Sequence, residues 1–397
     1  MPEVKSPKRT AGWTRVAFGD VVRLCTERSS DPEADGFERY IGLEHLDPGE
    51  LRVRRWGDLA DGVTFTNVFR PGQVLFGKRR AYQRKVAVAD FSGVCSGDIY
   101  VLEPKGDALL PELLPFICQT DAFFEHAVGT SAGSLSPRTN WENLANFEFP
   151  LPTIDRQKQT VAQCNGVEET LFALHDLTEA ARVVWLSTIQ DLEDRYSESA
   201  KPLGEFLSAI EPGRSVVGSD KPPSNGEYAV LKVSAVDPFG FQPHESKVLL
   251  DQREFMAQHK VCAGDLLMTR SNTPALVGET CIVDRDFPNL MLCDKTLRLV
   301  PKPGVSKGTL WHMLQSNRVR QQIAAVATGT GGAMKNISQP KIHSLRLCVP
   351  PSSRDADAVE ARLSQCIQAF RSCRARRQSC SDFKHALLKV LLAQEAE

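Results

Sequence analysis

The chain has 397 residues, of which 42% are hydrophobic and 24% are charged, and its formal net charge is −1. This length suits two or three domains, and this composition is that of a soluble globular protein. We expect no membrane span, because no apolar run reaches about 18 residues. The first residues are charged and lack the apolar centre of a secretory signal. The eleven Cys are scattered without a Cys-x-x-Cys pair, which argues against a disulfide framework or a zinc site and indicates a reducing cytoplasm.

A first globule is predicted for residues 13–152. Short apolar runs at 74–76, 86–88 and 99–102 predict strands, the last of them stopped by a Pro. Residues 109–128 then have the apolar periodicity of a helix. We therefore expect a globule that mixes strands and helices.

A second globule, residues 201–351, repeats the same order of features. The residues have diverged while the order has not, which is expected if each copy binds a different target. The matched segments are 18–20 with 203–205, 72–78 with 264–270, Cys95 with Cys293, the strand ending at Pro104 with the strand 297–301, and the helix 109–128 with a helix over 311–327.

Each globule ends in a Pro-rich stop that is followed by a long stretch with helical periodicity. A helix of about 40 residues is about 60 Å long, which suits a spacer better than a catalytic scaffold. Acidic residues beside the first apolar seam and basic residues beside the second favour packing of the two helices on each other. The first seam is Val161, Cys164, Val167, Leu171, Leu174, Thr178, Ala181, Trp185, Ile189 and Leu192, and the second is Val359, Leu363, Cys366, Phe370, Cys373, Cys380, Phe383, Leu387, Val390 and Leu391.

Several motifs suggest an enzyme, but their contexts argue against one. Residues 129–133 match the Gly-x-Ser-x-Gly nucleophile elbow, yet the second copy has Gly331 where the first has Ser131. Residues 72–79 nearly match a phosphate-binding loop, but Arg79 replaces the hydroxyl residue that would hold magnesium. Asp237 with the segment 245–247 is a weak match to a magnesium-dependent nuclease and is absent from the first copy. No amino-methyltransferase motif and no paired His ligands for a metal are present.

A basic loop in the first copy is the strongest functional feature. Five cations and a Tyr lie within eight residues directly after a predicted strand. Such dense charge needs a counter-charge, which DNA phosphates supply, so we favour nucleic-acid binding over a solvated hairpin tip. The candidate residues are Lys78, Arg79, Arg80, Tyr82, Arg84 and Lys85.

The matched loop of the second copy is less basic but rich in hydrogen-bonding side chains. Asn can read adenine and Arg can read guanine, so Arg270, Ser271 and Asn272 are candidate base-reading residues. Two Gly-rich loops, 129–138 and 329–338, allow close approach of backbone to a ligand. They add the candidate DNA-binding residues Thr130, Arg138, Thr330, Lys335 and Asn336.

With these features, the chain resembles the DNA-specificity subunit of type I restriction-modification systems. The segments that carry the resemblance are the strand and basic loop 74–85, the Gly-Thr loop 329–338, and Phe149-Pro150-Leu151-Pro152 followed by Asp155-Arg156-Gln157. The second copy has Ser352-Ser353-Arg354-Asp355 at the start of its long helix and lacks the Gln, so that end matches less well.

The resemblance implies an α+β protein. It would have two tandem α/β target-recognition globules with twisted, mostly antiparallel sheets, separated by two long helices that form an antiparallel coiled coil. The expected boundaries are 1–152 and 199–351 for the recognition domains, and 153–198 and 352–397 for the spacer helices. Each domain would read half of a split site in double-stranded DNA, with the half-sites about one helical turn, roughly 34 Å, apart.

The resemblance also implies partners and the absence of catalysis by this chain. Two methyltransferase (modification) subunits and a restriction motor-nuclease subunit would dock on it in the cytoplasm, without a membrane. S-adenosylmethionine, magnesium and ATP would bind to those partners, and this chain would hold no cofactor or metal of its own. The alternatives are a stand-alone nuclease and a two-headed protein–protein adaptor.

Overall fold

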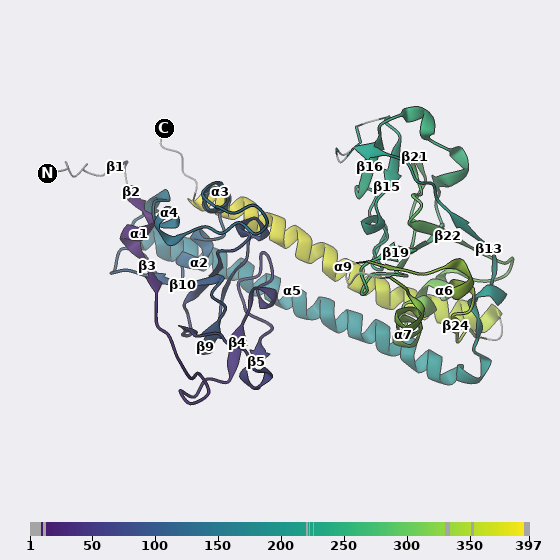
Figure 1. The fold of residues 1–397 in the computed structure, drawn as a ribbon, viewed down its shortest axis with the longest axis horizontal. Helices are drawn as coiled ribbons and strands as arrows, with labels where there is room; N and C mark the ends of the chain where they lie inside the picture. Colours follow the sequence, from purple (N-terminus) through teal and green to yellow (C-terminus); the bar gives the residue numbers. More distant parts are fainter. Residues whose placement is uncertain are drawn as a thin grey trace. The chain divides into compact units, whose positions relative to one another are not determined.

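The computed structural model describes residues 9–10, 13–219, 221, 223–224, 226–329, 334–350 and 353–392. These residues form two compact units (Figure 1). Unit 1 draws on Met1–Leu174 and Ala375–Glu397, and unit 2 is His175–Arg374. In the described part of the chain, no helix has the length and apolar character needed to cross a membrane.

Unit 1 consists of short strands and helices followed by part of each long helix. Its elements are β1 (Arg9–Thr10), β2 (Trp13–Ala17), α1 (Phe18–Val21), β3 (Val22–Cys25), β4 (Arg39–Ile41), η1 (Leu43–His45), β5 (Gly57–Asp58), η2 (Leu59–Asp61), β6 (Asn67–Phe69), β7 (Val74–Gly77), η3 (Ala81–Gln83), β8 (Val86–Val88), β9 (Gly93–Cys95), β10 (Ile99–Pro104), α2 (Leu114–Ile117), α3 (Asp121–Gly129), α4 (Trp141–Ala145) and β11 (Glu148–Pro152).

Two four-stranded sheets form the centre of unit 1. The order β3-β10-β7-β8 is antiparallel throughout, and the order β5-β4-β9-β6 has one parallel pair, β4 with β9. Strand β7 lies between two neighbours and is buried on both faces, with Val74 and Phe76 in one apolar cluster and Leu75 in another. This explains its uninterrupted apolar sequence, because neither face meets water.

Unit 2 repeats this plan. Its elements are η4 (Ser197–Ser199), β12 (Lys201–Pro202), η5 (Leu203–Glu205), β13 (Leu207–Pro212), β14 (Gly218–Ser219), β15 (Ala229–Leu231), η6 (Val233–Ala235), β16 (Ser246–Leu249), η7 (Gln252–Glu254), η8 (Ala257–His259), β17 (Lys260–Val261), β18 (Leu266–Thr269), β19 (Ser271–Asn272), β20 (Thr280–Ile282), β21 (Phe287–Met291), β22 (Thr296–Pro301), α6 (Lys307–Leu314), α7 (Asn317–Val326), β23 (Lys335–Asn336), α8 (Gln339–His343) and β24 (Arg346–Leu347).

The sheets of unit 2 match those of unit 1 in order and direction, with β14 as an additional edge strand of the second sheet. The antiparallel order β13-β22-β18-β20 corresponds to β3-β10-β7-β8, and the second sheet, β14-β16-β15-β21-β17, again contains one parallel pair, β15 with β21. Strand β18 is buried on both faces in the manner of β7, with Leu266 and Met268 in one cluster and Leu267 in another. The duplication predicted from the sequence therefore extends to strand order.

The helix predicted within each globule is two helices in the structure. The stretch 109–128 contains α2 and α3, and the stretch 311–327 lies over α6 and α7. In both cases a hydroxyl side chain starts the second helix, since Thr120 accepts a hydrogen bond from the amide of Phe123 and Ser316 accepts one from the amide of Val319. Apolar periodicity continues across such an N-cap, so the prediction of single helices was wrong at these two points.

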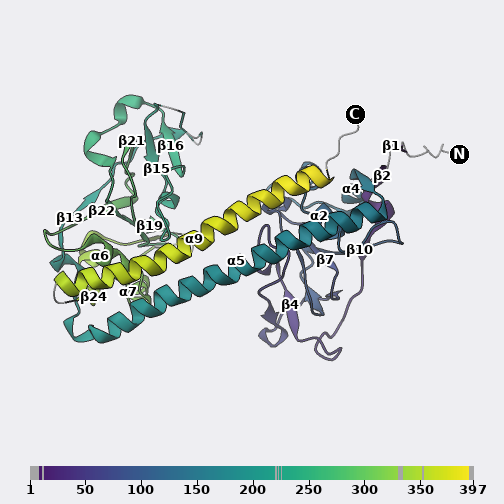
Figure 2. The ribbon, with the colours of Figure 1, turned by 180° about the vertical axis from the view of Figure 1, so that it is seen from behind.

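The two long helices are α5 (Ile154–Arg195) and α9 (Ser353–Leu392), and each contributes to both units. In unit 1 the first part of α5 lies beside the last part of α9 (Figures 1 and 2), where Cys164 and Leu388 share a buried cluster. In unit 2 the last part of α5 and the first part of α9 share a buried cluster that includes Trp185 and Leu363. The two helices are therefore antiparallel within each unit, and the expected α+β fold with mostly antiparallel sheets is confirmed.

The predicted seam of α9 is wrong near its end. Phe383 and Val390 are 58% and 70% exposed, whereas Lys384 and Leu388 are buried. Lys384 forms an ion pair with Glu168 of α5, and its ammonium also donates to the carbonyl of Gly49 at 3.2 Å. A Lys can lie in an apolar seam when a carboxylate meets it there, and hydropathy alone does not predict that pairing. The side chain of Leu391 lies outside the described residues.

A buried His joins α5 to α6 in unit 2. The indole Nε1 of Trp185 donates to Nδ1 of His312 at 3.0 Å, and both side chains are 1% exposed. Burial, and next the positive charge of Arg371, lower the pKa of His312 from 6.5 to about 3. His312 is therefore neutral in the folded protein at pH 7 and acts there as a hydrogen-bond acceptor.

We predict that unit 2 loses stability as the pH falls from about 6.5 toward about 3 because of His312. In this window the unfolded chain binds a proton at His312 that the folded chain does not, so each step down in pH favours unfolding. The thermal unfolding temperature should be measured across this window for the wild type and for His312→Gln. The stability advantage of the wild type should be largest above pH 6.5 and should shrink below it. A gap that does not change with pH would contradict this assignment.

Candidate nucleic-acid interface

The basic loop of the first copy is held to the end of the sheet by backbone hydrogen bonds. Directly after β7, the amide of Lys78 donates to the carbonyl of Asp98 at 3.0 Å, and the amide of Thr139 donates to the carbonyl of Lys78 at 3.0 Å. The amide of Arg80 donates to the carbonyl of Pro137 at 2.7 Å. The structure thus brings together the basic loop and the Gly-rich loop, which are distant in the sequence.

The second copy has the same clamp. The amide of Arg270 donates to the carbonyl of Lys295 at 2.7 Å, and the amide of Ile337 donates to the carbonyl of Arg270 at 3.0 Å. These bonds define three matched positions in the two copies: Lys78 with Arg270, Asp98 with Lys295, and Thr139 with Ile337. We use the term loop clamp for these bonds. They tie the residue directly after β7 or β18 to the segment before β10 or β22 and to the segment before α4 or α8.

Three Arg of the first copy meet at Asp98 and Ser136. Oδ1 of Asp98 accepts from Nε of Arg138 at 2.8 Å, and Oδ2 accepts from Nη1 of Arg79 at 3.1 Å. The hydroxyl of Ser136 accepts from both Arg79 and Arg80 at 3.1 Å. Burial alone would raise the pKa of Asp98, but the hydrogen bonds from Arg138 and Arg79 outweigh it and hold that pKa below its ordinary value. Asp98 is therefore a carboxylate at neutral pH.

The other cations of this loop also have partners within the protein. Arg84 donates to Asp121 at 2.6 Å, and its guanidinium lies 4.7 Å from the centre of the Phe124 ring. The ammonium of Lys85 donates to the carbonyl of Leu43 at 2.6 Å, and that of Lys78 lies 4.6 Å from the centre of the Tyr100 ring. Two acids distant in the sequence, Asp98 and Asp121, therefore supply part of the counter-charge that the sequence assigned to phosphate. The partners of Lys78, Arg80 and Lys85 are uncharged.

Arg80 and Tyr82 remain directed toward solvent. Arg80 is exposed and Tyr82 is 56% exposed, whereas Ala81 between them is buried. Arg80 and Arg84 have φ angles of 54° and 55°, a left-handed conformation that costs free energy for residues other than Gly. Backbone strain of this kind is concentrated at binding and catalytic sites. The hydrogen-bonded loop holds this strain while presenting Tyr82 outward.

Thr130 and Ser131 have structural roles in the Gly-rich loop. The hydroxyl of Thr130 donates to the carbonyl of His126 at 2.8 Å, and that of Ser131 donates to the carbonyl of Ala127 at 2.7 Å. Both hydroxyls therefore cap the end of α3. This geometry gives Ser131 no activation as a nucleophile and leaves Thr130 as a residue that shapes the loop.

In the second copy the candidate residues lie on two paired short strands. Strand β19, Ser271 with Asn272, pairs with β23, Lys335 with Asn336. The buried hydroxyl of Ser271 donates to the side-chain carbonyl of Asn336, which fixes both side chains, whereas Arg270 is exposed. Thr330 lies outside the described residues.

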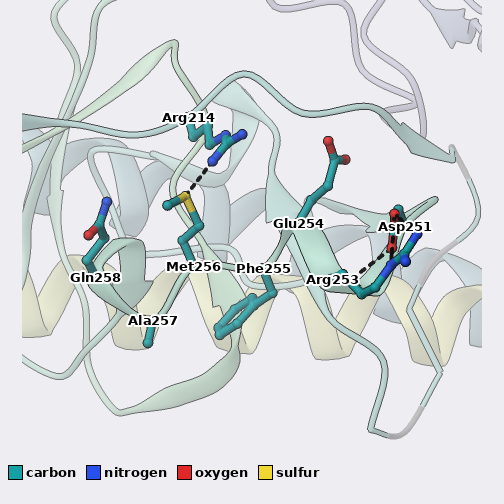
Figure 3. A pocket seen from close by; sticks show the side chains of 8 residues that line it. All are labelled: Arg214, Asp251, Arg253, Glu254, Phe255, Met256, Ala257 and Gln258. Carbon is teal, nitrogen blue, oxygen red and sulfur yellow. Dashed lines mark hydrogen bonds and ion pairs between the residues drawn. The ribbon is translucent and has the colours of Figure 1, made fainter.

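The described residues hold no cluster of three or more His, Cys, Asp or Glu that could bind a metal ion. A hollow of about 740 Å³ lies in unit 2 beside the segment 251–258 (Figure 3). Its cations point at neighbours within the hollow: Arg253 donates to Asp251 at 2.8 Å, and Arg214 donates to the sulfur of Met256 at 2.8 Å. We assign this hollow no ligand.

Comparisons with known proteins agree with the duplicated fold. No family model matches the sequence. The specificity subunit of the type I restriction enzyme EcoEI from Escherichia coli is 26% identical over 170 residues, which cover 42% of this chain and 28% of that protein. The EcoDI specificity subunit from Escherichia coli is 32% identical over 182 residues, 44% of this chain and 38% of that protein. The matches thus span well under half of these relatives.

A solved structure extends the likeness in fold to nearly the whole chain. The S subunit of a type I restriction-modification system from M. genitalium superposes with a TM-score of 0.56 and 13% identity, and the match covers 98% of this chain and 100% of that one. The resemblance to type I specificity subunits that the sequence suggested is therefore confirmed, in sequence over part of the chain and in fold over nearly all of it.

We predict that Arg84 stabilises the basic loop, whereas Arg80 does not. Arg84→Ala removes the ion pair with Asp121 and the contact with the Phe124 ring, and it should lower the free energy of unfolding by about 1–2 kcal/mol. Arg80→Ala is the matched control, because Arg80 has the same backbone conformation but only a hydroxyl partner. Denaturant unfolding of both variants provides the measurement. Equal stability of the two variants would contradict the prediction.

Proposed function

We propose that this chain is the DNA-specificity subunit of a type I restriction-modification complex. The observation that carries the proposal is the duplicated loop clamp, which puts different side chains on the same backbone frame at the end of two matched sheets. Two loops with the same backbone hydrogen bonds but different side chains suit the recognition of two different DNA sequences. The likeness to specificity subunits supports the same conclusion.

In this proposal each recognition domain reads one half of a split, non-palindromic site in double-stranded DNA. Residues 1–152 and 199–351 are the recognition domains, and residues 153–198 and 352–397 are the spacer helices. Arg80 and Tyr82 are the exposed candidates in the first domain. In the second domain the candidates are Arg270, which is exposed, and Asn272, which is half-buried. Ser271 is buried and bonded to Asn336, which supports a role in positioning that side chain.

We further propose that catalysis resides in partner subunits. Methylation of adenine requires the base to be flipped into an enzyme pocket, and the sequence contains no motif of such a pocket. Two methyltransferase subunits with S-adenosylmethionine, and a restriction motor-nuclease subunit with magnesium and ATP, would supply the chemistry.

The nuclease alternative is weakened by the partners of its candidate acids. Asp237 forms an ion pair with Arg374 at 3.3 Å and accepts from the amide of Phe239 at 2.7 Å. Glu245 accepts from the hydroxyl of Ser234 at 2.6 Å and lies 4.0 Å from the ammonium of Lys232. These carboxylates are tied to local structure and do not converge as a magnesium site. The adaptor alternative predicts no affinity for DNA.

Selection of bound duplexes from a random pool tests the proposal. The full chain should bind duplex DNA at low salt, should not cut it in magnesium when alone, and should enrich a sequence with two separate informative halves. Asn272→Ala should relax the choice of base in one half by about 1–3 kcal/mol per position. Tyr82→Ala should relax the other half only.

Lys302→Ala is the control, because Lys302 is exposed and lies outside the candidate loops. It should leave the enriched sequence unchanged. Failure of the wild type to retain duplex DNA at low salt would contradict the proposal, as would magnesium-dependent cutting by the purified chain. Loss of information from both halves in either variant would remove the assignment of one reader to each half.

A further inference from the structure

The two loop clamps carry opposite charge at one matched position. Asp98 of the first copy and Lys295 of the second accept the corresponding backbone hydrogen bonds, from Lys78 and Arg270. The next residues agree, since Ile99 pairs with Gly77 in the first sheet and Thr296 pairs with Thr269 in the second. An acid in one copy therefore lies where the other copy has a base.

In the first copy, both carboxylate oxygens of Asp98 accept hydrogen bonds from Arg side chains of the same protein. Asp98 is 19% exposed at its side chain and binds both Arg79 and Arg138. A DNA phosphate approaching these two guanidinium groups would have to compete with a carboxylate that is already bound to them. This one carboxylate leaves the first copy with net positive charge, but Arg79 and Arg138 each already have an acidic partner.

In the second copy the acid and both of its Arg partners are replaced. Ser271 follows Arg270 as Arg79 follows Lys78, and Asn336 pairs with Thr328 as Arg138 pairs with Ala132. Ser271 and Asn336 bond to each other and carry no charge. Where the first copy has an acid bonded to two cations, the second copy has two neutral side chains bonded to each other.

The cations around this neutral pair have no acidic partner among the described residues. Arg270 and Lys295 are exposed, and the described part of the chain offers their side chains no hydrogen bond or ion pair. The ammonium of Lys335 reaches only the carbonyl of Gly329, at 3.5 Å. Of the nearby acids, Asp294 makes no ion pair with Lys295 in the described structure, and Glu279 is buried and paired with Arg320 at 3.4 Å.

We propose that Lys295 and Lys335, beside the base-reading candidate Arg270, form a surface that binds the phosphate backbone of DNA. The three residues lie on adjoining segments, because Arg270 is bonded to Lys295 through the backbone and β19 after it pairs with β23, which contains Lys335. A cation that neutralises a phosphate releases counterions condensed on the DNA, and a cation without an internal acidic partner breaks no ion pair to do so. The second copy would then contribute phosphate contacts of its own, although its loop is the less basic in sequence. This inference rests on the proposed function.

The salt dependence of DNA binding by the full chain tests the inference. The dissociation constant for a duplex should be measured over a range of salt concentrations for the wild type, Lys295→Ala and Lys302→Ala. Lys295→Ala should reduce the slope of log affinity against log salt by about one, the value for one lost phosphate contact. Lys302→Ala, which removes an exposed Lys of the same unit outside the clamp, should leave the slope unchanged.

The reciprocal variant addresses the first copy. Asp98→Asn should free Arg79 and Arg138 and raise the slope by up to about two, with thermal unfolding used to check that the protein remains folded. A wild-type slope for Lys295→Ala, or a lower slope for folded Asp98→Asn, would overturn the inference while leaving DNA binding intact. Absence of duplex binding by the wild type would instead overturn the proposed function.

Discussion

Burial of the two long helices against both globules is the constraint on which the rest of the structure depends. In unit 2 the last part of α5 contributes Trp185, Ile189 and Leu192 to the same buried cluster as Leu363 and Phe370 of α9. In unit 1 the ion pair between Glu168 and Lys384, and a buried cluster that includes Cys164 and Leu388, join the other parts of these helices. Because each helix contributes to two cores, neither globule completes its interior from its own strands and short helices alone.

The loop clamp allows the repeated fold to carry two different surfaces. The backbone bonds of Lys78 and Arg270 are the same in both copies, so side chains beside them can change without altering the frame. The first copy places Tyr82 outward from a strained, internally paired loop, and the second places Arg270 outward beside a neutral Ser–Asn pair. Shared backbone geometry with divergent side chains would allow the two copies to recognise different targets, as proposed.

Much of this fold was predictable from the sequence, because apolar patterns and Gly and Pro positions report burial and turns directly. The strands at 74–76 and 99–102 and the seam of α5 follow from such patterns. Two kinds of feature were not predictable. Local capping by Thr120 and Ser316 breaks helices where apolar periodicity continues. Ion pairs between residues distant in the sequence, such as Asp98 with Arg79 and Arg138, decide which cations lack an acidic partner. Sequence spacing does not predict these pairs.

The proposed function requires two matched surfaces on one chain to bind one DNA duplex. Hydroxyl-radical footprinting of the full chain on a duplex that carries its preferred site measures this binding. We expect two protected segments separated by an unprotected stretch, with protection of one segment lost in Tyr82→Ala and of the other in Asn272→Ala. One continuous protected segment, or two segments that weaken together in either variant, would contradict it.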